Sequence, residues 1–189
     1  RKPRPMLESF HGKANPQAIE TAWPYLQSED YHLRYAARIA IEWQDTKNWA
    51  NQAYAENNDL SAIHALLGLA RSDHSNSMEP SINRLLKVNF SKLDKTAKLA
   101  LLRTYSVIIS RAGKPSQYQM DAMGKQLDPY YPSENDNLNE ELCRVLSFLQ
   151  HPTVVSKTIA LLKTTKAKVP DFDPEIMKRG NNYGKRILT

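Results

Sequence analysis

The most informative segment of the chain is residues 28–41, which reads SEDYHLRYAARIAI. Its apolar residues recur at the spacing of one helical face, at Leu33, Ala37, Ala40 and Ile41. The adjacent carboxylates Glu29 and Asp30 lie where the first helical turn is expected, and negative charge is favoured there. Because small residues let two helices approach to about 8–10 Å, this segment predicts a helix that packs closely against other helices.

The same helical period continues along most of the chain. Further apolar stripes occur at Leu60, Ile63, Leu67 and Ala70, at Ala97, Leu101, Tyr105 and Ile108, at Leu138, Leu142, Val145, Leu146 and Leu149, and at Val155, Ile159 and Leu162. Residues 107–109 are the only run with the composition of a short strand, but this run lies inside a long helical pattern. We therefore predict an all-α fold.

The predicted helices form consecutive pairs. Their expected bounds are 16–27 with 30–43, 46–56 with 59–71, 77–88 with 94–112, and 115–128 with 137–150. Residues 152–164 would begin a fifth pair, completed by a short helix near 175–187, and a helix near 4–12 would cap the first pair. The second helices of successive pairs are centred about 28, 39 and 40 residues apart, a spacing typical of an α-solenoid.

We therefore predict a single domain over residues 1–189, an α-solenoid (HEAT/armadillo-like) of four to five antiparallel helix pairs. The expected repeats lie near 16–43, 46–71, 77–112, 115–150 and 152–187. Within them, Pro24 should kink or end its helix near Trp23, and Gly113 should end the helix 94–112. The expected N-caps include Asp59 and Asn137.

Residues 28–41 resemble the second helix of a HEAT repeat. The roles of that pattern fall on Asp30, Leu33, Arg34, Ala37, Ala40 and Ile41. In such a pattern the Asp and the Arg can join adjacent turns by charge-assisted hydrogen bonds. The second pair keeps Asp59, Ile63, Leu66 and Leu67 but has His64 where an Arg is expected, and later pairs keep only the apolar spacing.

A narrower resemblance extends from about residue 17 to residue 187. It is carried by the phrases Trp23-Pro24-Tyr25-Leu26, Leu33-Arg34-Tyr35-Ala36-Ala37-Arg38, Ala65-Leu66-Leu67-Gly68-Leu69-Ala70-Arg71, Leu138-Asn139-Glu140-Glu141-Leu142-Cys143 and Tyr183-Gly184-Lys185. These are similar to the HEAT-like segment of large exported bacterial proteins, where it joins a propeller-type sugar-dehydrogenase-like domain to a c-type haem domain. The resemblance implies a spacer or docking module in the periplasm or another exported location. The haem attachment pattern Cys-x-x-Cys-His is absent from the chain.

The composition limits the classes of function. Of 189 residues, 41% are hydrophobic, and the single cysteine, Cys143, excludes an internal disulfide framework and a thiolate-rich metal site. We expect Cys143 to be a buried, inert thiol, and the tryptophans Trp23, Trp43 and Trp49 to fill the core and the contacts between repeats. No apolar run approaches the roughly 18 residues that span a bilayer, so we expect no membrane insertion.

The sequence contains no pattern that requires catalysis. No two of the five histidines stand three or four residues apart, so no helix face presents a ready pair of metal ligands. The neighbouring carboxylates Glu140 and Glu141, like Glu29 and Asp30, are accounted for by stabilisation of a first helical turn. We predict no catalytic residue, no cofactor site and no metal site, and a protein that is not an enzyme.

The net charge of +6 leaves an alternative open. The basic side chains concentrate at the C-terminal end, at Lys157, Lys163, Lys166, Lys168, Lys178, Arg179, Lys185 and Arg186. Clustered Lys and Arg displace counterions from phosphates, so the alternative is a nucleic-acid-binding HEAT-like solenoid, including a glycosylase-like one. A solvated basic surface explains the same residues, and we favour that interpretation because no aromatic-and-Asp pocket can be placed in the sequence.

The favoured hypothesis is a non-catalytic protein-interaction or spacer module of a larger protein, with another protein or an adjacent domain as its partner. The chain begins Arg1-Lys2-Pro3 with no initiator Met and no signal-like stretch, and we expect it to continue beyond Thr189. A monomer is favoured. Because Arg and Tyr are strong contact residues, the candidate partner-binding face consists of Tyr31, Tyr35, Arg38, His64, Arg71, Arg103 and Arg144.

Overall fold

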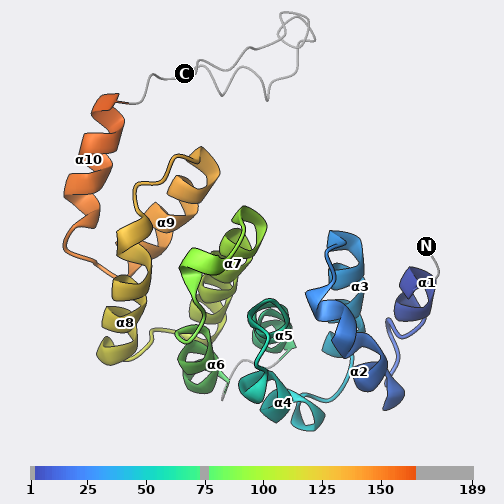
Figure 1. Ribbon diagram of the computed structural model, residues 1–189. Coiled ribbons are helices and arrows are strands. Elements are labelled where there is room, and N and C mark those ends of the chain that lie inside the picture. The colour runs from blue at the N-terminus through green and yellow to red at the C-terminus, as the bar shows by residue number, and fades with distance from the viewer. Residues whose placement is uncertain (1–2, 73–76, 165–189) are drawn as a thin grey trace, which may run out of the picture. The chain divides into compact units, whose positions relative to one another are not determined.

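The structure, a computed structural model, describes residues 3–72 and 77–164 (Figure 1). These residues form ten α-helices and four short 3-10 helices, with no strand among them. The all-α prediction is confirmed. The helices are α1 (Pro3–Glu8), α2 (Gln17–Ala22), α3 (Tyr31–Glu42), α4 (Ala50–Ala55), α5 (Asp59–Ser72), α6 (Met78–Leu85), α7 (Lys95–Ala112), α8 (Gln117–Leu127), α9 (Asp136–Phe148) and α10 (Val154–Thr164). The 3-10 helices are η1 (Trp23–Gln27), η2 (Thr46–Asn48), η3 (Phe90–Lys92) and η4 (Asp128–Tyr130).

Each helix expected within the described ranges is present, most of them with ends a few residues inside the expected bounds. The short helix expected near 175–187 lies outside the described residues. The chain divides into two compact units, Arg1–Thr158 and Ile159–Thr189. Only the end of α10 is described in the second unit, so a fifth helix pair stays a prediction. No helix in the described ranges is both long and apolar enough to cross a membrane.

Within the unit Arg1–Thr158, the helices from α2 to α9 stand in two rows (Figure 1). The odd row consists of α3, α5, α7 and α9, and each of these helices contacts the next. The even row consists of α2, α4, α6 and α8, and each of these helices contacts the odd-row helix that follows it in the chain. Helix α1 packs on α3. Contacts therefore run between neighbours in sequence.

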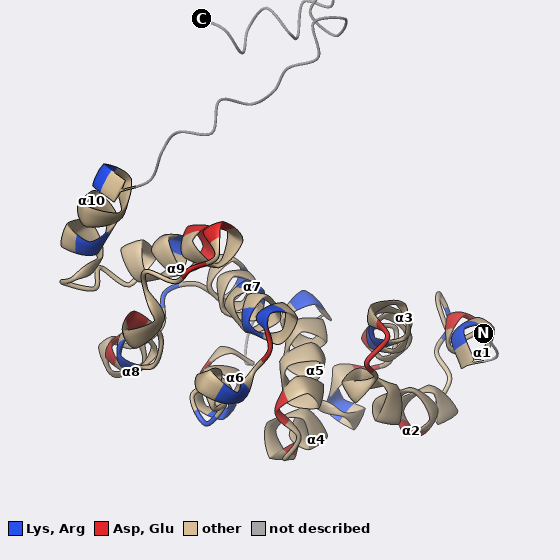
Figure 2. Ribbon diagram, turned by 45° about the horizontal axis from the view of Figure 1, so that its top comes forward, with Lys and Arg blue, Asp and Glu red and all other residues tan. Residues whose placement is uncertain are grey.

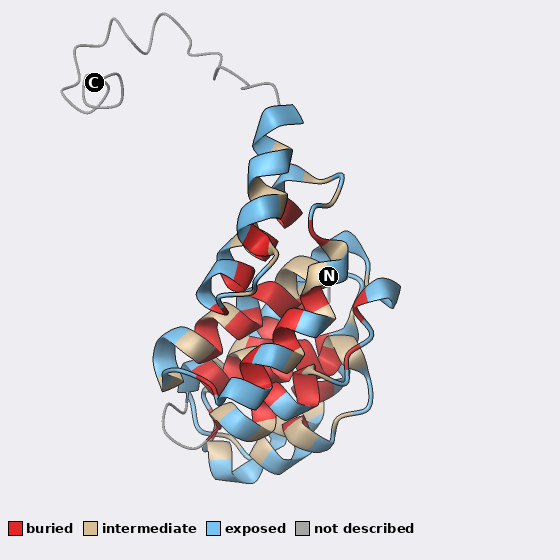
Figure 3. Cartoon of the chain, turned by 90° about the vertical axis from the view of Figure 1, so that its left-hand side faces the viewer, coloured by how far each residue is buried: buried red, intermediate tan, exposed pale blue. Residues whose placement is uncertain are grey.

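The apolar core lies between the two rows (Figure 3). Its largest fully buried side chains come from every successive pair up to α7, and include Leu26, Ile41, Trp49, Ile63, Leu66, Leu69, Ile82, Leu85, Leu101, Leu102 and Tyr105. Trp23 and Trp49 meet edge to face with ring centroids 6.5 Å apart, whereas Trp43 is exposed. The expected stripe of α10 is also exposed, at Val155, Ile159 and Leu162.

Local signals in the sequence account for the helix ends. Helix α2 ends at Ala22, and the chain continues through Pro24 as η1, as Pro24 predicts. Gly113 ends α7 with a φ of 97°. The predicted N-caps are wrong by one or two residues: Asn135, not Asn137, caps α9, and Asn58, not Asp59, accepts the hydrogen bond from the Ser61 N–H.

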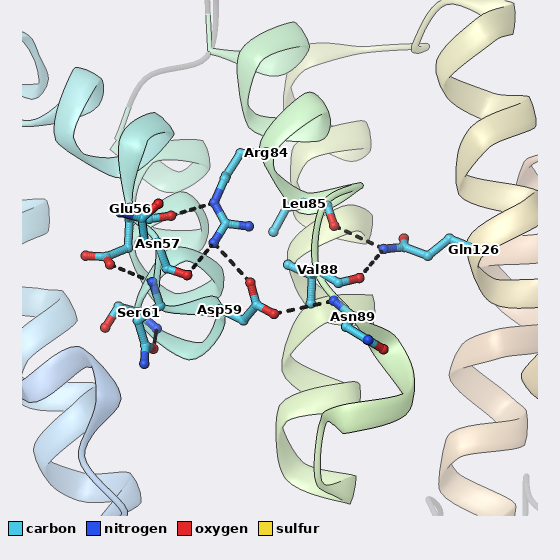
Figure 4. Close-up of polar contacts among 10 residues, drawn as sticks. Glu56, Asn57, Asp59, Ser61, Arg84, Leu85, Val88, Asn89 and Gln126 are labelled. Carbon is cyan, nitrogen blue, oxygen red and sulfur yellow. Dashed lines mark hydrogen bonds and ion pairs between the residues drawn. The ribbon is translucent and has the colours of Figure 1, made fainter.

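A series of hydrogen bonds fixes the position of one helix pair against the next (Figure 4). The buried guanidinium of Arg84 donates to the Glu56 carbonyl oxygen at 2.6 Å and to the Asp59 carboxylate at 3.0 Å. One pair further along, the Gln126 amide donates to the carbonyl oxygens of Leu85 at 3.1 Å and Val88 at 3.0 Å. These bonds join the end of one even-row helix to the preceding pair, so they help to set the spacing between successive pairs.

The first HEAT-like Asp and Arg do not bond as the motif suggests. Asp30 caps α3, where its carboxylate accepts from the His32 N–H at 2.7 Å. Arg34 donates to the carbonyl oxygens of Ser28 at 2.6 Å and Glu29 at 3.0 Å, within the turn that precedes its own helix. The link between adjacent turns is made by Asp59 and Arg84 instead.

Candidate functional site

The odd row carries all seven residues of the predicted partner-binding face. Tyr31, Tyr35 and Arg38 lie on α3, His64 and Arg71 on α5, Arg103 on α7, and Arg144 on α9. They line two grooves between neighbouring helices. Arg103 lines both grooves, so the two share one wall. The structure therefore brings the seven residues onto adjoining surfaces of one row.

The first groove, here the His64 groove, lies between α3, α5 and α7 and has a volume of about 320 Å³. Its lining comprises Tyr31, Arg34, Tyr35, Arg38, Leu60, His64, Leu67, Lys95, Thr96, Ala97, Leu99, Ala100 and Arg103. Leucine and alanine side chains supply its apolar part, and the charged residues among those that line it are all basic.

The second groove, here the Arg144 groove, lies between α5, α7 and α9 and has a volume of about 990 Å³. Its lining comprises Arg71, Arg103, Ser106, Val107, Ile109, Ser110, Arg111, Gly113, Lys114, Glu141, Arg144, Val145, Ser147, Phe148 and Gln150. Figure 2 shows basic positions along α7, and acidic and basic positions together on α9. This groove is wider and contains the carboxylate of Glu141.

Two tyrosines form the outer edge of the His64 groove. Tyr31 and Tyr35 stack with ring centroids 6.4 Å apart, and their exposed fractions are 56% and 48%. Arg34 lies over the Tyr31 ring at 5.9 Å, and Arg38 lies over the Tyr35 ring at 5.2 Å. Cation–π contacts of this kind hold the rings in place. The tyrosines therefore present fixed, exposed aromatic faces at this edge of the groove.

The two arginines behind these rings are buried and already paired. Arg34 satisfies part of its guanidinium on the carbonyl oxygens of Ser28 and Glu29. Arg38 forms an ion pair with Glu42, and the same carboxylate accepts from Arg71 on the next helix at 3.2 Å. Arg38 was predicted as a contact residue, but the structure places it in the wall of the groove, where Glu42 neutralises it.

His64 lies in the same wall and has no polar partner. Its exposed fraction is 7%, and neither ring nitrogen has a hydrogen bond among the described residues. Burial, followed by the positive charges of Arg34 and Arg38, lowers the pKa of His64 from 6.5 to about 4. The imidazole is therefore neutral at pH 7 and carries one unmet donor and one unmet acceptor.

The basic residues of the face differ in whether they are free to bind. Arg144 is held by carboxylates of its own helix, Glu140 at 2.9 Å and Glu141 at 2.6 Å. Arg103 and Lys95 are exposed and have no hydrogen-bond or ion-pair partner within the described ranges. Lys95 begins α7 and belongs to no periodic stripe, so the sequence offered no signal for it.

Polar side chains outside the grooves hold the last described helices together. The Asp128 carboxylate accepts from Thr153 and pairs with Lys157 at 2.8 Å, while His151 lies 3.4 Å from it. Lys157, counted above among the basic C-terminal residues, is thus neutralised. Hydrogen bonds with Lys157 and Thr153 outweigh the effect of burial and lower the pKa of Asp128.

Cys143 is half-buried, so the expectation of a fully buried thiol is wrong. Its sulfur lies 3.6 Å from the Thr158 hydroxyl, which also contacts the Tyr131 hydroxyl at 2.7 Å. Burial would raise the pKa of Cys143, but hydrogen bonds with Thr158, Tyr131 and Ser147 produce a net lowering. Of the neighbouring carboxylates, Asp30 caps α3, and Glu140 and Glu141 pair with Arg144. No group of three or more metal-ligating side chains is found in the described part of the chain.

Comparisons of the chain with protein-family models, with curated proteins and with solved structures found no match.

Proposed function

We propose that the chain is a non-catalytic protein-interaction or spacer module, and that the odd row binds another protein or an adjacent domain. The observation that carries this proposal is the pair of adjoining grooves that share the unpaired Arg103. Apart from Glu141, every charged residue that lines the two grooves is basic. The complementary partner surface is acidic, because opposite potentials steer two proteins together and fix their register.

The same proposal includes a HEAT-like α-solenoid of antiparallel helix pairs. Supporting it, each helix of the odd row contacts the next helix of that row, and α4 contacts α6 in the even row. The hydrogen bonds of Arg84 and Gln126 repeat at the same end of neighbouring pairs. In a solenoid each repeat buries its apolar face against its neighbours. One row then forms an extended surface on which a partner touches several repeats, as the residues from α3 to α9 would require.

The composition of the face favours a protein partner. Tyr31 and Tyr35 offer large, fixed aromatic surfaces at its edge, and aromatic and Arg residues contribute most to protein interfaces. The groove walls hold leucine and valine side chains between the charged ones. A mixture of apolar and polar side chains is typical of protein interfaces.

A peptide selection tests the proposal. The protein is used to enrich a random displayed peptide library, in parallel with Arg103→Glu and with Lys125→Glu, which reverses an exposed charge on α8. We expect enriched peptides that contain Asp or Glu, whose enrichment falls at least tenfold with Arg103→Glu and is retained with Lys125→Glu. No enrichment, or an equal effect of both variants, would contradict an interaction role for this face.

The alternative is a nucleic-acid-binding solenoid, which the unpaired cations Arg103 and Lys95 favour. A fluorescent DNA duplex titrated at low and at moderate salt separates the two hypotheses. Phosphate contacts give an affinity that falls steeply with salt. We expect no salt-sensitive binding, and tight binding at low salt that is lost with Arg103→Glu would establish the alternative.

A further inference from the structure

We infer that the His64 groove binds an apolar residue next to a carboxylate, as an acidic peptide of a partner protein presents it. This inference rests on the proposed function and specifies the chemistry of one contact within it. The groove holds about 320 Å³, which is at the low end of the roughly 300–1,000 Å³ of ligand pockets. That volume accommodates one side chain with its neighbouring carboxylate rather than a whole folded element.

The walls of the groove supply the apolar half of the contact. Leu60 and Leu67 come from α5, and Leu99 comes from α7. The neutral ring of His64 completes this surface, because an uncharged imidazole can lie against an aliphatic side chain. Burying such a side chain removes its apolar surface from water, so the apolar residue provides affinity that a salt bridge at the surface does not.

Two buried polar groups in the same wall lack partners. These are both ring nitrogens of His64 and the Nε of Arg34, which is 6% exposed. Each unsatisfied buried group destabilises the folded protein, and native structures contain few of them. Both groups lie in the wall of this groove with their unpaired atoms covered, so a carboxylate bound in the groove would act on them through its charge and not through a direct hydrogen bond.

The charges select a carboxylate over a phosphate backbone. Arg34 and Arg38 face His64 from α3, but their guanidinium groups are bonded to the chain itself. Lys95 and Arg103 line the same groove from α7 and are unpaired within the described ranges. Two unpaired cations suit one carboxylate, which an Arg can bind with two parallel hydrogen bonds, whereas a nucleic acid needs a longer series of basic contacts.

The test uses small probes and NMR of the whole chain. N-acetyl-leucine carries a terminal carboxylate, and N-acetyl-leucyl-aspartyl-amide carries a side-chain carboxylate. Their neutral counterparts are N-acetyl-leucinamide and N-acetyl-leucyl-asparaginyl-amide. We expect at least one carboxylate probe to bind at least tenfold more tightly than its neutral counterpart, with shifts at Thr96 and Ala100. The probe that binds shows whether the groove accepts a terminal or a side-chain carboxylate.

His64 provides a readout that mere surface adsorption would not move. A bound carboxylate counteracts the positive charges around the ring, so it should raise the pKa of His64 by about one unit, measured from the ring carbon shifts. Arg103→Met should remove the preference for the carboxylate probe, and Arg144→Met, which changes only the other groove, should retain it. Equal binding of neutral and charged probes, or an unchanged preference in Arg103→Met, would overturn the inference.

Failure of the carboxylate-probe test can be distinguished from failure of the proposed function, which the peptide selection tests. If the peptide selection succeeds but neither carboxylate probe binds, the partner uses the Arg144 groove and only this inference fails. If the selection also fails, the interaction role of the face fails with it.

Discussion

Arg84 on α6 and Asp59 at the start of α5 form an ion pair of 3.0 Å that joins two consecutive helix pairs. The guanidinium is buried, and the same group also donates to the carbonyl oxygens of Glu56 and Asn57. A buried Arg with three acceptors is worth more than an exposed pair, because removing it takes a donor from two carbonyl oxygens and leaves the Asp59 carboxylate with the Asn89 N–H alone.

We therefore expect Arg84→Met to lower the free energy of unfolding by about 2 kcal/mol or more. Asp59→Asn, which keeps a side-chain oxygen acceptor, should cost about half as much. The matched control is Arg144→Met, which removes an exposed intrahelical pair worth less than about 1 kcal/mol. Urea denaturation of the three variants checks this, and equal losses for Arg84→Met and Arg144→Met would contradict it.

His64 makes stability depend on pH. Its folded pKa of about 4 lies below the unfolded value of 6.5, so the unfolded chain binds more protons between these values. The resulting stability is fully present above pH 6.5 and is lost as the pH falls towards 4. The contribution is on the order of 3 kcal/mol.

We expect His64→Leu to be more stable than the parent protein at pH 4.5 and to show a flatter stability profile between pH 7 and pH 4.5. Thermal unfolding across this range is the measurement, with the exposed His32→Leu as the control. Identical profiles for the parent protein and His64→Leu would mean that the imidazole titrates normally.

Gly124 on α8 leaves room for His151. A Cβ at Gly124 would lie 2.5 Å from the His151 Cδ2, and His151 is positioned by Thr153 at 3.0 Å. We expect Gly124→Ala to destabilise the protein by about 1–2 kcal/mol through this overlap. In a His151→Ala background the same change should stabilise by about 0.5–1 kcal/mol, because Ala favours a helix interior over Gly. A double-mutant cycle by urea denaturation measures the difference, and additive effects would contradict the contact.

Arg103 should matter for binding and not for folding. Because it is exposed and unpaired within the described ranges, Arg103→Met should change stability by less than about 0.5 kcal/mol. Arg38→Met should cost more, since it removes a buried partner of Glu42. Thermal unfolding of the two variants provides the comparison, and a large loss in Arg103→Met would reveal a structural role.

The helical spacing of apolar residues in the sequence predicts most of the helices in the structure. The stripe from Leu33 to Ile41 predicts α3 to within a residue or two, because an amphipathic helix needs only its own spacing to be recognised. The residue that caps each helix is harder to predict from the sequence. Asn135, Asp136 and Asn137 are all short polar residues, and the tertiary position of the first turn decides which of them becomes the N-cap.

The burial and ion pairing of each site residue are harder to predict from the sequence than the helix on which it lies. The pairing of Arg144 with Glu140 and Glu141 follows from their i,i+3 and i,i+4 spacing and could have been predicted. The burial of Arg38 could not, because it depends on the packing of α5 and α7 beside α3. The same holds for Trp43, whose exposure is set by where the neighbouring helices lie.

The loop between α4 and α5 is hydrogen-bonded to both of the neighbouring helix pairs. The Glu56 carboxylate accepts from the Trp23 indole N–H at 2.6 Å, while its carbonyl oxygen accepts from Arg84. Glu56 therefore links the first helix pair directly to the third, beside the bonds that Arg84 makes to Asn57 and Asp59. If force pulls the two ends of the row apart, we expect the hydrogen bonds of Glu56 to break before the apolar core is exposed.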